Sequence, residues 1–208
     1  LRDAAGSNAN LVVREAHAES PDGPFSELLR AHPPREHPWL ILRYPVRNET
    51  RRTVWAGPLS AESAASWLDS PLRRVIATQL IEGKAGVWLL LESGDRARDN
   101  RAFDVLNDEL ARLERVLRLP EEYAPPDASG PSFSRLRLSR DDPDEAALVA
   151  LLLGSEPDLP ELRGEPMVFP IFGRGMILYA LIGAGINENT IAEAAEFLTG
   201  ACSCEVKS

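Results

Sequence analysis

Cysteine and histidine are scarce in this sequence. Its 208 residues include only two cysteines, Cys202 and Cys204, and three histidines. A small domain held together by disulfides would be shorter and far richer in cysteine, so that class is excluded. The histidines His17, His32 and His37 do not recur at the spacing of ligands on one helix face, so they predict no zinc motif.

Positive charge is in deficit as well. Lys and Arg number 23 against 32 Asp and Glu, which gives a formal net charge of -9. General nucleic-acid binders and proteins of anionic membranes need a positive field, so we expect neither kind of partner. Basic residues do gather at Arg43, Arg47, Arg51 and Arg52, where they could accept a phosphate or an acidic partner. A solvated hairpin whose charges protect its edge is the preferred interpretation.

Long hydrophobic runs are missing too. The best candidate, residues 167–185, is interrupted by Pro170, by glycines and by Arg174. A membrane helix needs about 20 consecutive apolar residues, so we expect no membrane span. With 44% hydrophobic and 26% charged residues, the composition is that of a soluble, acidic globular chain with one large core or two smaller ones.

The chain begins at Leu1 rather than at a methionine. A removed leader would explain this start, and an exported or periplasmic location is the expectation that follows from it. A trimmed sequence would explain the same start, so the compartment is left unknown at this point.

One order of elements occurs twice along the chain. Residues 10–68 and 133–198 each read as a short alternating strand, a Pro/Asp turn, an amphipathic helix, an apolar strand opened by a proline, a second strand and a closing helix. Ser60 and Asn187 are the expected caps of the closing helices. After the first of them, Ser70-Pro71 predicts a break, with Ser70 as the cap of a new helix and the proline at its first position.

Two further elements lie between the copies. Residues 85–95, AGVWLLLESGD, form a near-continuous apolar run bounded by glycines, which is typical of a central strand covered on both faces. Residues 98–119 repeat apolar side chains at helical spacing and predict a long amphipathic helix. A loop rich in Pro, Gly and Ser follows at residues 121–132.

From residue 85 the predicted order is strand, helix, strand, helix, strand, strand, helix. This order resembles the thioredoxin-like superfamily, and EPMVFPIFGRGMILYALIGAGINENTIAEAAEFL, from Glu165 on, is similar to that family's closing half. The resemblance implies an α/β fold, a thioredoxin-like mixed sheet flanked by helices, in two tandem repeats. Residues 85–208 would be the complete thioredoxin-like domain and residues 1–84 an incomplete repeat.

In that family a cis-proline before a central strand borders the active site. The resemblance gives this groove-lining position to Pro166, and the corresponding position of the first copy to Pro38. Redox members carry Cys-x-x-Cys where the first central strand meets its helix, because a helix N-terminus lowers the pKa of a thiol. The junction here, residues 93–100, reads SGDRARDN and has no cysteine. We therefore predict no catalytic residue and a non-catalytic member of this fold.

Two function classes follow from these patterns. The first is a protein-binding or scaffold module without a cofactor, which binds a protein partner in the groove beside Pro38 or Pro166 or at a sheet edge, and which is compatible with a homo-oligomer. The second is a thiol-dependent protein for metal handling or disulfide exchange. Its site would be Cys202 and Cys204, which could close a strained disulfide or bind Cu(I) or Zn(II). Against the second, one Cys-x-Cys supplies two of the four ligands of a structural zinc site, and the cysteines could be packing or incidental residues.

Overall fold

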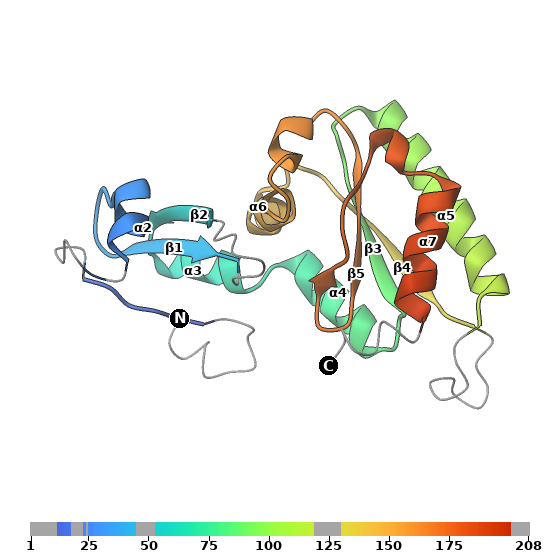
Figure 1. Ribbon diagram of the computed structural model, residues 1–208, viewed down its shortest axis with the longest axis horizontal. Coiled ribbons are helices and arrows are strands. Elements are labelled where there is room, and N and C mark those ends of the chain that lie inside the picture. Colours follow the sequence, from blue (N-terminus) through green and yellow to red (C-terminus); the bar gives the residue numbers. More distant parts are fainter. Residues whose placement is uncertain (1–11, 18–22, 24, 45–52, 119–129, 201–208) are drawn as a thin grey trace.

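The structure, a computed structural model, describes residues 12–17, 23, 25–44, 53–118 and 130–200 (Figure 1). Its longer helices and its strands, in chain order, are α2 (Ser26–Ala31), β1 (Trp39–Arg43), β2 (Thr53–Pro58), α3 (Ala61–Leu68), α4 (Pro71–Ile81), β3 (Gly86–Leu91), α5 (Arg96–Val116), β4 (Phe133–Leu138), α6 (Ala146–Gly154), β5 (Met167–Phe172), β6 (Met176–Ile177), β7 (Leu181–Ile182) and α7 (Glu188–Thr199).

A mixed five-stranded sheet forms the centre of the molecule. Its strand order is β4-β3-β5-β6, and β7 pairs with the beginning of β5 whereas β6 pairs with its end. Strands β3 and β4 are parallel, whereas β5 is antiparallel to β3 and to both short strands. All six residues of β3 are buried, as expected for a continuous apolar strand between two covered faces. The chain is therefore an α/β protein with a mixed sheet flanked by helices.

Helices cover both faces of this sheet (Figure 1). Successive side chains of a strand point to opposite faces, so β3 contributes to two separate clusters. Trp88 and Leu90 pack with α5 and α7 on one side. Val87, Leu89 and Leu91 pack with α4 and α6 on the other. The sheet thus separates two hydrophobic layers.

Helix α6 is apolar on nearly every side, because it lies between the sheet and the N-terminal part of the chain (Figure 1). Leu152 packs in the cluster shared with β3 and β5. On the opposite side, the Tyr44 hydroxyl donates a hydrogen bond to the Leu151 carbonyl. A Cβ at Gly154 would lie 3.3 Å from the Tyr44 ring, so the absence of a side chain there permits this close approach.

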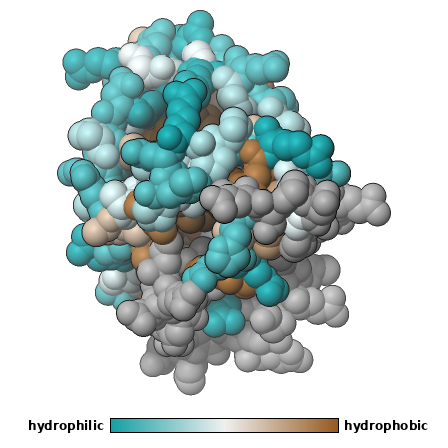
Figure 2. All heavy atoms as spheres, turned by 90° about the vertical axis from the view of Figure 1, so that its left-hand side faces the viewer, coloured by the Kyte–Doolittle hydropathy of each residue, from teal (hydrophilic) through white to brown (hydrophobic). Residues whose placement is uncertain are grey.

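The N-terminal unit, α2 to α3, is built around an antiparallel pair, β1 and β2. Among its described residues only Gly57 is buried, so this unit has no fully enclosed side chain of its own. Trp55 and Trp67 pack with ring centroids 5.5 Å apart. Seen from this side, the coloured surface is largely hydrophilic, with hydrophobic groups visible in the hollows between (Figure 2).

The elements of this unit, α2-β1-β2-α3, follow an order like that of α6-β5-β6-β7-α7, which has one short strand more. The sequence predicted a strand at the beginning of the first copy. This prediction is wrong for the described residues 12–17, which form neither strand nor helix. A strand needs a hydrogen-bonded neighbour, and in the described part of the chain the small sheet consists of β1 and β2 alone.

The predicted helix break is confirmed. Helix α3 ends at Leu68, and α4 begins at Pro71 with Ser70 as its N-cap. The buried side chain of Ile76 packs α4 against the core cluster of the five-stranded sheet. Helix α4 therefore packs on the five-stranded sheet, while α3 packs on α6. None of the helices in the described ranges is both long and apolar enough to cross a membrane.

Candidate functional site

Several loops meet where the parallel strands β3 and β4 end. Leu91 and Leu138, the last residues of these strands, are paired, and Leu91 is also paired with Met167 at the start of β5. The segments before α5, after β4 and before β5 therefore gather at one end of the sheet. Ligands of open α/β sheets bind at the carboxyl ends of the strands, so we expect a binding site at this end of the sheet.

A buried carboxylate fixes the loop before α5. Asp99 is 2% exposed and accepts hydrogen bonds from the backbone N–H and hydroxyl of Ser93, both at 2.8 Å, and from the Gly94 N–H at 3.1 Å. Asp95 caps the helix and accepts from the Ala97 and Arg98 N–H groups. The hydrogen bond from the Arg98 N–H, together with the charges of Arg98 and Arg101, lowers the pKa of the Asp95 carboxyl.

Arg140 joins the end of β3 to the start of β5. Its Nε donates to the Glu92 carbonyl at 2.6 Å, and its Nη2 donates to the Glu165 carbonyl at 2.7 Å. Burial and then the charge of Arg163 lower the pKa of this guanidinium, while Asp99 acts in the opposite direction. Arg140 thus holds the segment before Pro166 in place.

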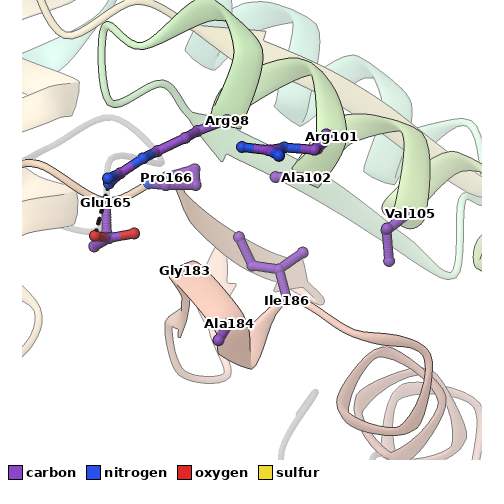
Figure 3. Close-up of a pocket in the computed structure, with 9 residues that line it drawn as sticks. All are labelled: Arg98, Arg101, Ala102, Val105, Glu165, Pro166, Gly183, Ala184 and Ile186. Carbon is purple, nitrogen blue, oxygen red and sulfur yellow. Dashed lines mark hydrogen bonds and ion pairs between the residues drawn. The ribbon is translucent and has the colours of Figure 1, made fainter.

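A cavity of about 330 Å³ opens beside these groups. Figure 3 shows Arg98 and Arg101 on the α5 wall, opposite Ala184 and Ile186, with the guanidinium of Arg101 turned towards Pro166. The lining residues are Arg98, Arg101, Ala102, Val105, Glu165, Pro166, Gly183, Ala184 and Ile186. We call this cavity the α5 groove.

One ion pair crosses the end of the α5 groove. Arg98 Nη1 lies 2.8 Å from Glu165 Oε1 and also donates to the Gly164 carbonyl at 3.2 Å. Its Nε lies 3.5 Å from an Asp95 carboxylate oxygen. By contrast, Arg101 makes no hydrogen bond or ion pair with any residue that the structure describes. The groove therefore contains one neutralised and one available guanidinium.

The two predicted prolines occupy different places. Pro166 lines the α5 groove, whereas Pro38 lies before β1 in the small sheet, where its carbonyl accepts the Leu59 N–H at 2.9 Å. Of these two prolines, only Pro38 follows a cis peptide bond. The resemblance predicted a cis bond before Pro166, and this prediction is wrong. The Glu165–Pro166 bond is trans, the ordinary isomer, and Arg140 holds the backbone there through the Glu165 carbonyl.

The other predicted residues fall largely outside this part of the structure. Cys202, Cys204, Arg47, Arg51 and Arg52 all lie outside the described residues. No group of three His, Cys, Asp or Glu side chains that could hold a metal ion occurs in the described ranges.

Sequence reasoning missed Arg98 and Arg101, although the segment that it singled out for its lack of cysteine, SGDRARDN, contains Arg98 and ends one residue before Arg101. The available signal was positional. Arginines at i and i+3 in the first turns of a helix that follows the central strand project from one helix face into whatever opens there.

Comparison of the chain with protein-family models, with curated proteins and with solved structures gave no match in any of the three.

Replacing Asp99 with asparagine should loosen the loop that shapes the groove. The NH2 group of the amide would face one of the N–H donors of Ser93 and Gly94, so that hydrogen bond would be lost. The substitution would also remove the negative charge near Arg140. We therefore expect the free energy of unfolding to fall by about 1–3 kcal/mol. Urea denaturation measures this loss, and hydrogen exchange should show faster exchange of the Gly94 amide. Asp104→Asn, at an exposed position of the same helix, is the control and should change stability by no more than about 0.5 kcal/mol. Equal effects of the two substitutions would contradict the assigned role.

Proposed function

We propose that this chain is a non-catalytic, thioredoxin-like protein-binding module whose α5 groove accepts a segment of a partner protein. The observation that carries this proposal is the cavity beside Pro166, at the junction between the central strand and α5. In the thioredoxin-like arrangement this junction and this proline border the active site, so the binding surface would be retained while the catalytic thiols are absent.

The arrangement of residues 86–199 supports the thioredoxin-like assignment. The strands and α-helices follow the order β3-α5-β4-α6-β5-β6-β7-α7, in which the short strands β6 and β7 take the place of one edge strand. The first two of these strands are parallel and β5 is antiparallel to both short strands, with α5 and α7 packed on the face opposite α6. The order of these elements is the feature on which the sequence resemblance rests, and the mixed sheet between two layers of helices supports the proposal.

An incomplete first repeat is part of the same proposal. The order α2-β1-β2-α3 matches the closing half of the second unit, and the small sheet lacks the parallel strands that would complete it among the described residues. Such a half-unit cannot enclose a core alone, which agrees with its half-buried side chains and its packing on α6.

The chemistry at the junction favours binding over catalysis. Ser93 occupies a position near the start of α5, but its hydroxyl donates to the Asp99 carboxylate and accepts the Asp95 N–H at 3.1 Å. A serine nucleophile needs a neighbouring general base to remove its proton, and the buried Asp99 is instead committed to two backbone N–H groups. Ser93 therefore serves to build the loop.

The proposal is tested by selecting binders from a displayed library of random linear peptides against the purified chain. Affinities of the synthetic, fluorescently labelled peptides are then measured by anisotropy. Ala184→Trp places a large ring at an exposed position of the groove wall, so we expect it to weaken binding about tenfold or more without lowering stability. Ala77→Trp, at an exposed position of α4, is the matched control and should bind as the parent does.

A double variant, Cys202→Ser with Cys204→Ser, separates this proposal from a thiol-dependent function. Helix α7 begins next to the groove and has 12 residues, so its far end lies about 18 Å away along the helix axis. We expect groove binding to persist in the double serine variant. Peptide binding that survives Ala184→Trp, or that is lost with the two thiols, would overturn the proposal.

A further inference from the structure

The main chain beside Pro166 has no free hydrogen-bonding group. The Glu165 N–H donates to the Leu162 carbonyl at 3.0 Å, and the Glu165 carbonyl accepts from Arg140. Proline has no N–H, and the Pro166 carbonyl accepts the Gly183 N–H at 2.9 Å. A partner segment thus cannot add itself to the backbone here as an extra strand, and the groove must recognise it through side chains.

The charged side chains that line the groove are those of Arg98, Arg101 and Glu165. Arg101 presents a guanidinium without an ion-pair partner among the described residues, and the pair of Arg98 with Glu165 lies beside it. The facing wall is apolar, with Ala184 and Ile186 opposite α5 (Figure 3). A guanidinium accepts a carboxylate through two parallel hydrogen bonds, and the apolar wall suits a hydrophobic neighbour of that carboxylate.

Glu165 already shows how a carboxylate fits this groove. A Cβ at Gly183, which has φ 51°, would lie 2.8 Å from Glu165 Oε2, so the carboxylate lies directly against the glycine backbone. The side chains of Arg98 and Glu165 are 46% and 43% exposed. Exposed ion pairs contribute only about 0–1 kcal/mol, so a carboxylate from another chain can exchange with that of Glu165.

We infer that the α5 groove recognises an acidic residue next to a hydrophobic one in a partner protein, with Arg101 as the anchor and Glu165 as an internal competitor for Arg98. The inference rests on the proposed binding function of the groove. An extended polyanion fits poorly, because the chain has a net charge of -9 and the groove holds just these two arginines. A short acidic and apolar peptide segment matches both walls.

The probes are pools of short labelled peptides, acetylated and amidated, that contain a central Glu-Leu pair within randomised uncharged residues. A second pool has Gln-Leu, a third has phosphoserine-Leu, and a fourth has Gln-Leu with a free C-terminal carboxylate. Anisotropy should show the Glu-Leu pool binding about tenfold more tightly than the amidated Gln-Leu pool, because a charge-assisted pair is lost with the glutamine. Added salt should reduce this preference.

Three variants test the roles assigned to Arg101 and Glu165. Arg101→Gln should abolish the preference for Glu-Leu, whereas Glu165→Gln should raise affinity for the Glu-Leu pool about threefold or more, because Arg98 is released. Arg96→Gln, at an exposed position of α5 outside the groove lining, is the matched control and should change nothing. An unchanged or lower affinity in Glu165→Gln would overturn the role of Glu165 as a competitor.

The pools also separate this inference from the proposed function. Binding that is blocked by Ala184→Trp but is equal for Glu-Leu and amidated Gln-Leu would overturn the acidic specificity and leave the binding groove standing. Preference for the phosphoserine pool, or for the free C-terminal carboxylate alone, would overturn a side-chain carboxylate as the ligand. If no pool and none of the selected peptides binds at the groove, the proposed function itself is overturned.

Discussion

Replacing Phe169 with alanine is expected to lower the free energy of unfolding by about 3–5 kcal/mol. Phe169 lies in the middle of β5, is 0% exposed and pairs in register with Leu89 of the central strand. Its ring packs in the cluster that α4 and α6 cover, so truncation leaves a cavity that rigid sheet neighbours cannot fill. Such a loss is a large share of the stability of an ordinary domain, which is about 5–15 kcal/mol.

Urea denaturation followed by circular dichroism measures this loss. The matched control is Phe103→Ala on α5, where the half-buried ring lies under the Arg137 guanidinium at 4.9 Å. That substitution removes a partly exposed contact and should cost about 1 kcal/mol. If both phenylalanines cost the same, the burial difference between the sheet centre and the α5 surface would be contradicted.

Replacing Glu145 with alanine is expected to lower the free energy of unfolding by about 2–4 kcal/mol. Glu145 is 3% exposed and lies before α6, yet its carboxylate accepts from the Ser70 hydroxyl at 2.5 Å and from the Leu72 N–H at 2.6 Å. It therefore satisfies the N-terminus of α4 from another part of the chain, where the helix dipole favours a negative charge. Alanine would leave these donors buried without a partner, next to the Arg73 guanidinium.

Two variants make this prediction specific. Asp144→Ala changes the exposed acidic neighbour and should alter stability by no more than about 0.5 kcal/mol. Glu145→Gln keeps an oxygen that accepts from the Leu72 N–H, and its NH2 group can donate a hydrogen bond to the Ser70 hydroxyl. We therefore expect it to lower the free energy of unfolding less than alanine does. Hydrogen exchange of α4 locates the effect, and an alanine variant whose α4 amides exchange no faster than those of the parent would contradict the assignment.

The strands and helices themselves were largely readable from short windows. The apolar run at β3 predicted a strand buried on both faces, and the caps Ser60, Ser70 and Asn187 were all correctly anticipated. These features depend on neighbours within a few residues, through side-chain to N–H hydrogen bonds and through the fixed φ of proline. The thioredoxin-like resemblance and the tandem repeat stay predictions.

The edge of the sheet was less predictable. The second strand of the closing half appears as two short strands, β6 and β7, around an irregular section at residues 178–180. There the Leu178 N–H donates to the Pro170 carbonyl, while the Ala180 N–H donates to a Glu156 carboxylate oxygen at 3.0 Å. A distant carboxylate that replaces a strand partner leaves no trace in the local pattern of residues.

The sequence by itself determined the α/β class, the positions of the main elements and the break before Pro71, because these follow from periodicity, capping and backbone restrictions within a few residues. Only the tertiary structure decided that α4 packs with the second unit and that Glu145 caps it. The tertiary structure also decided the α5 groove, because Arg98 and Glu165, which pair there, are 67 residues apart in the sequence. Contacts of this kind are created by the pairing of β3 with β5 and by the packing of helices on the sheet, which bring distant segments to one end of the molecule.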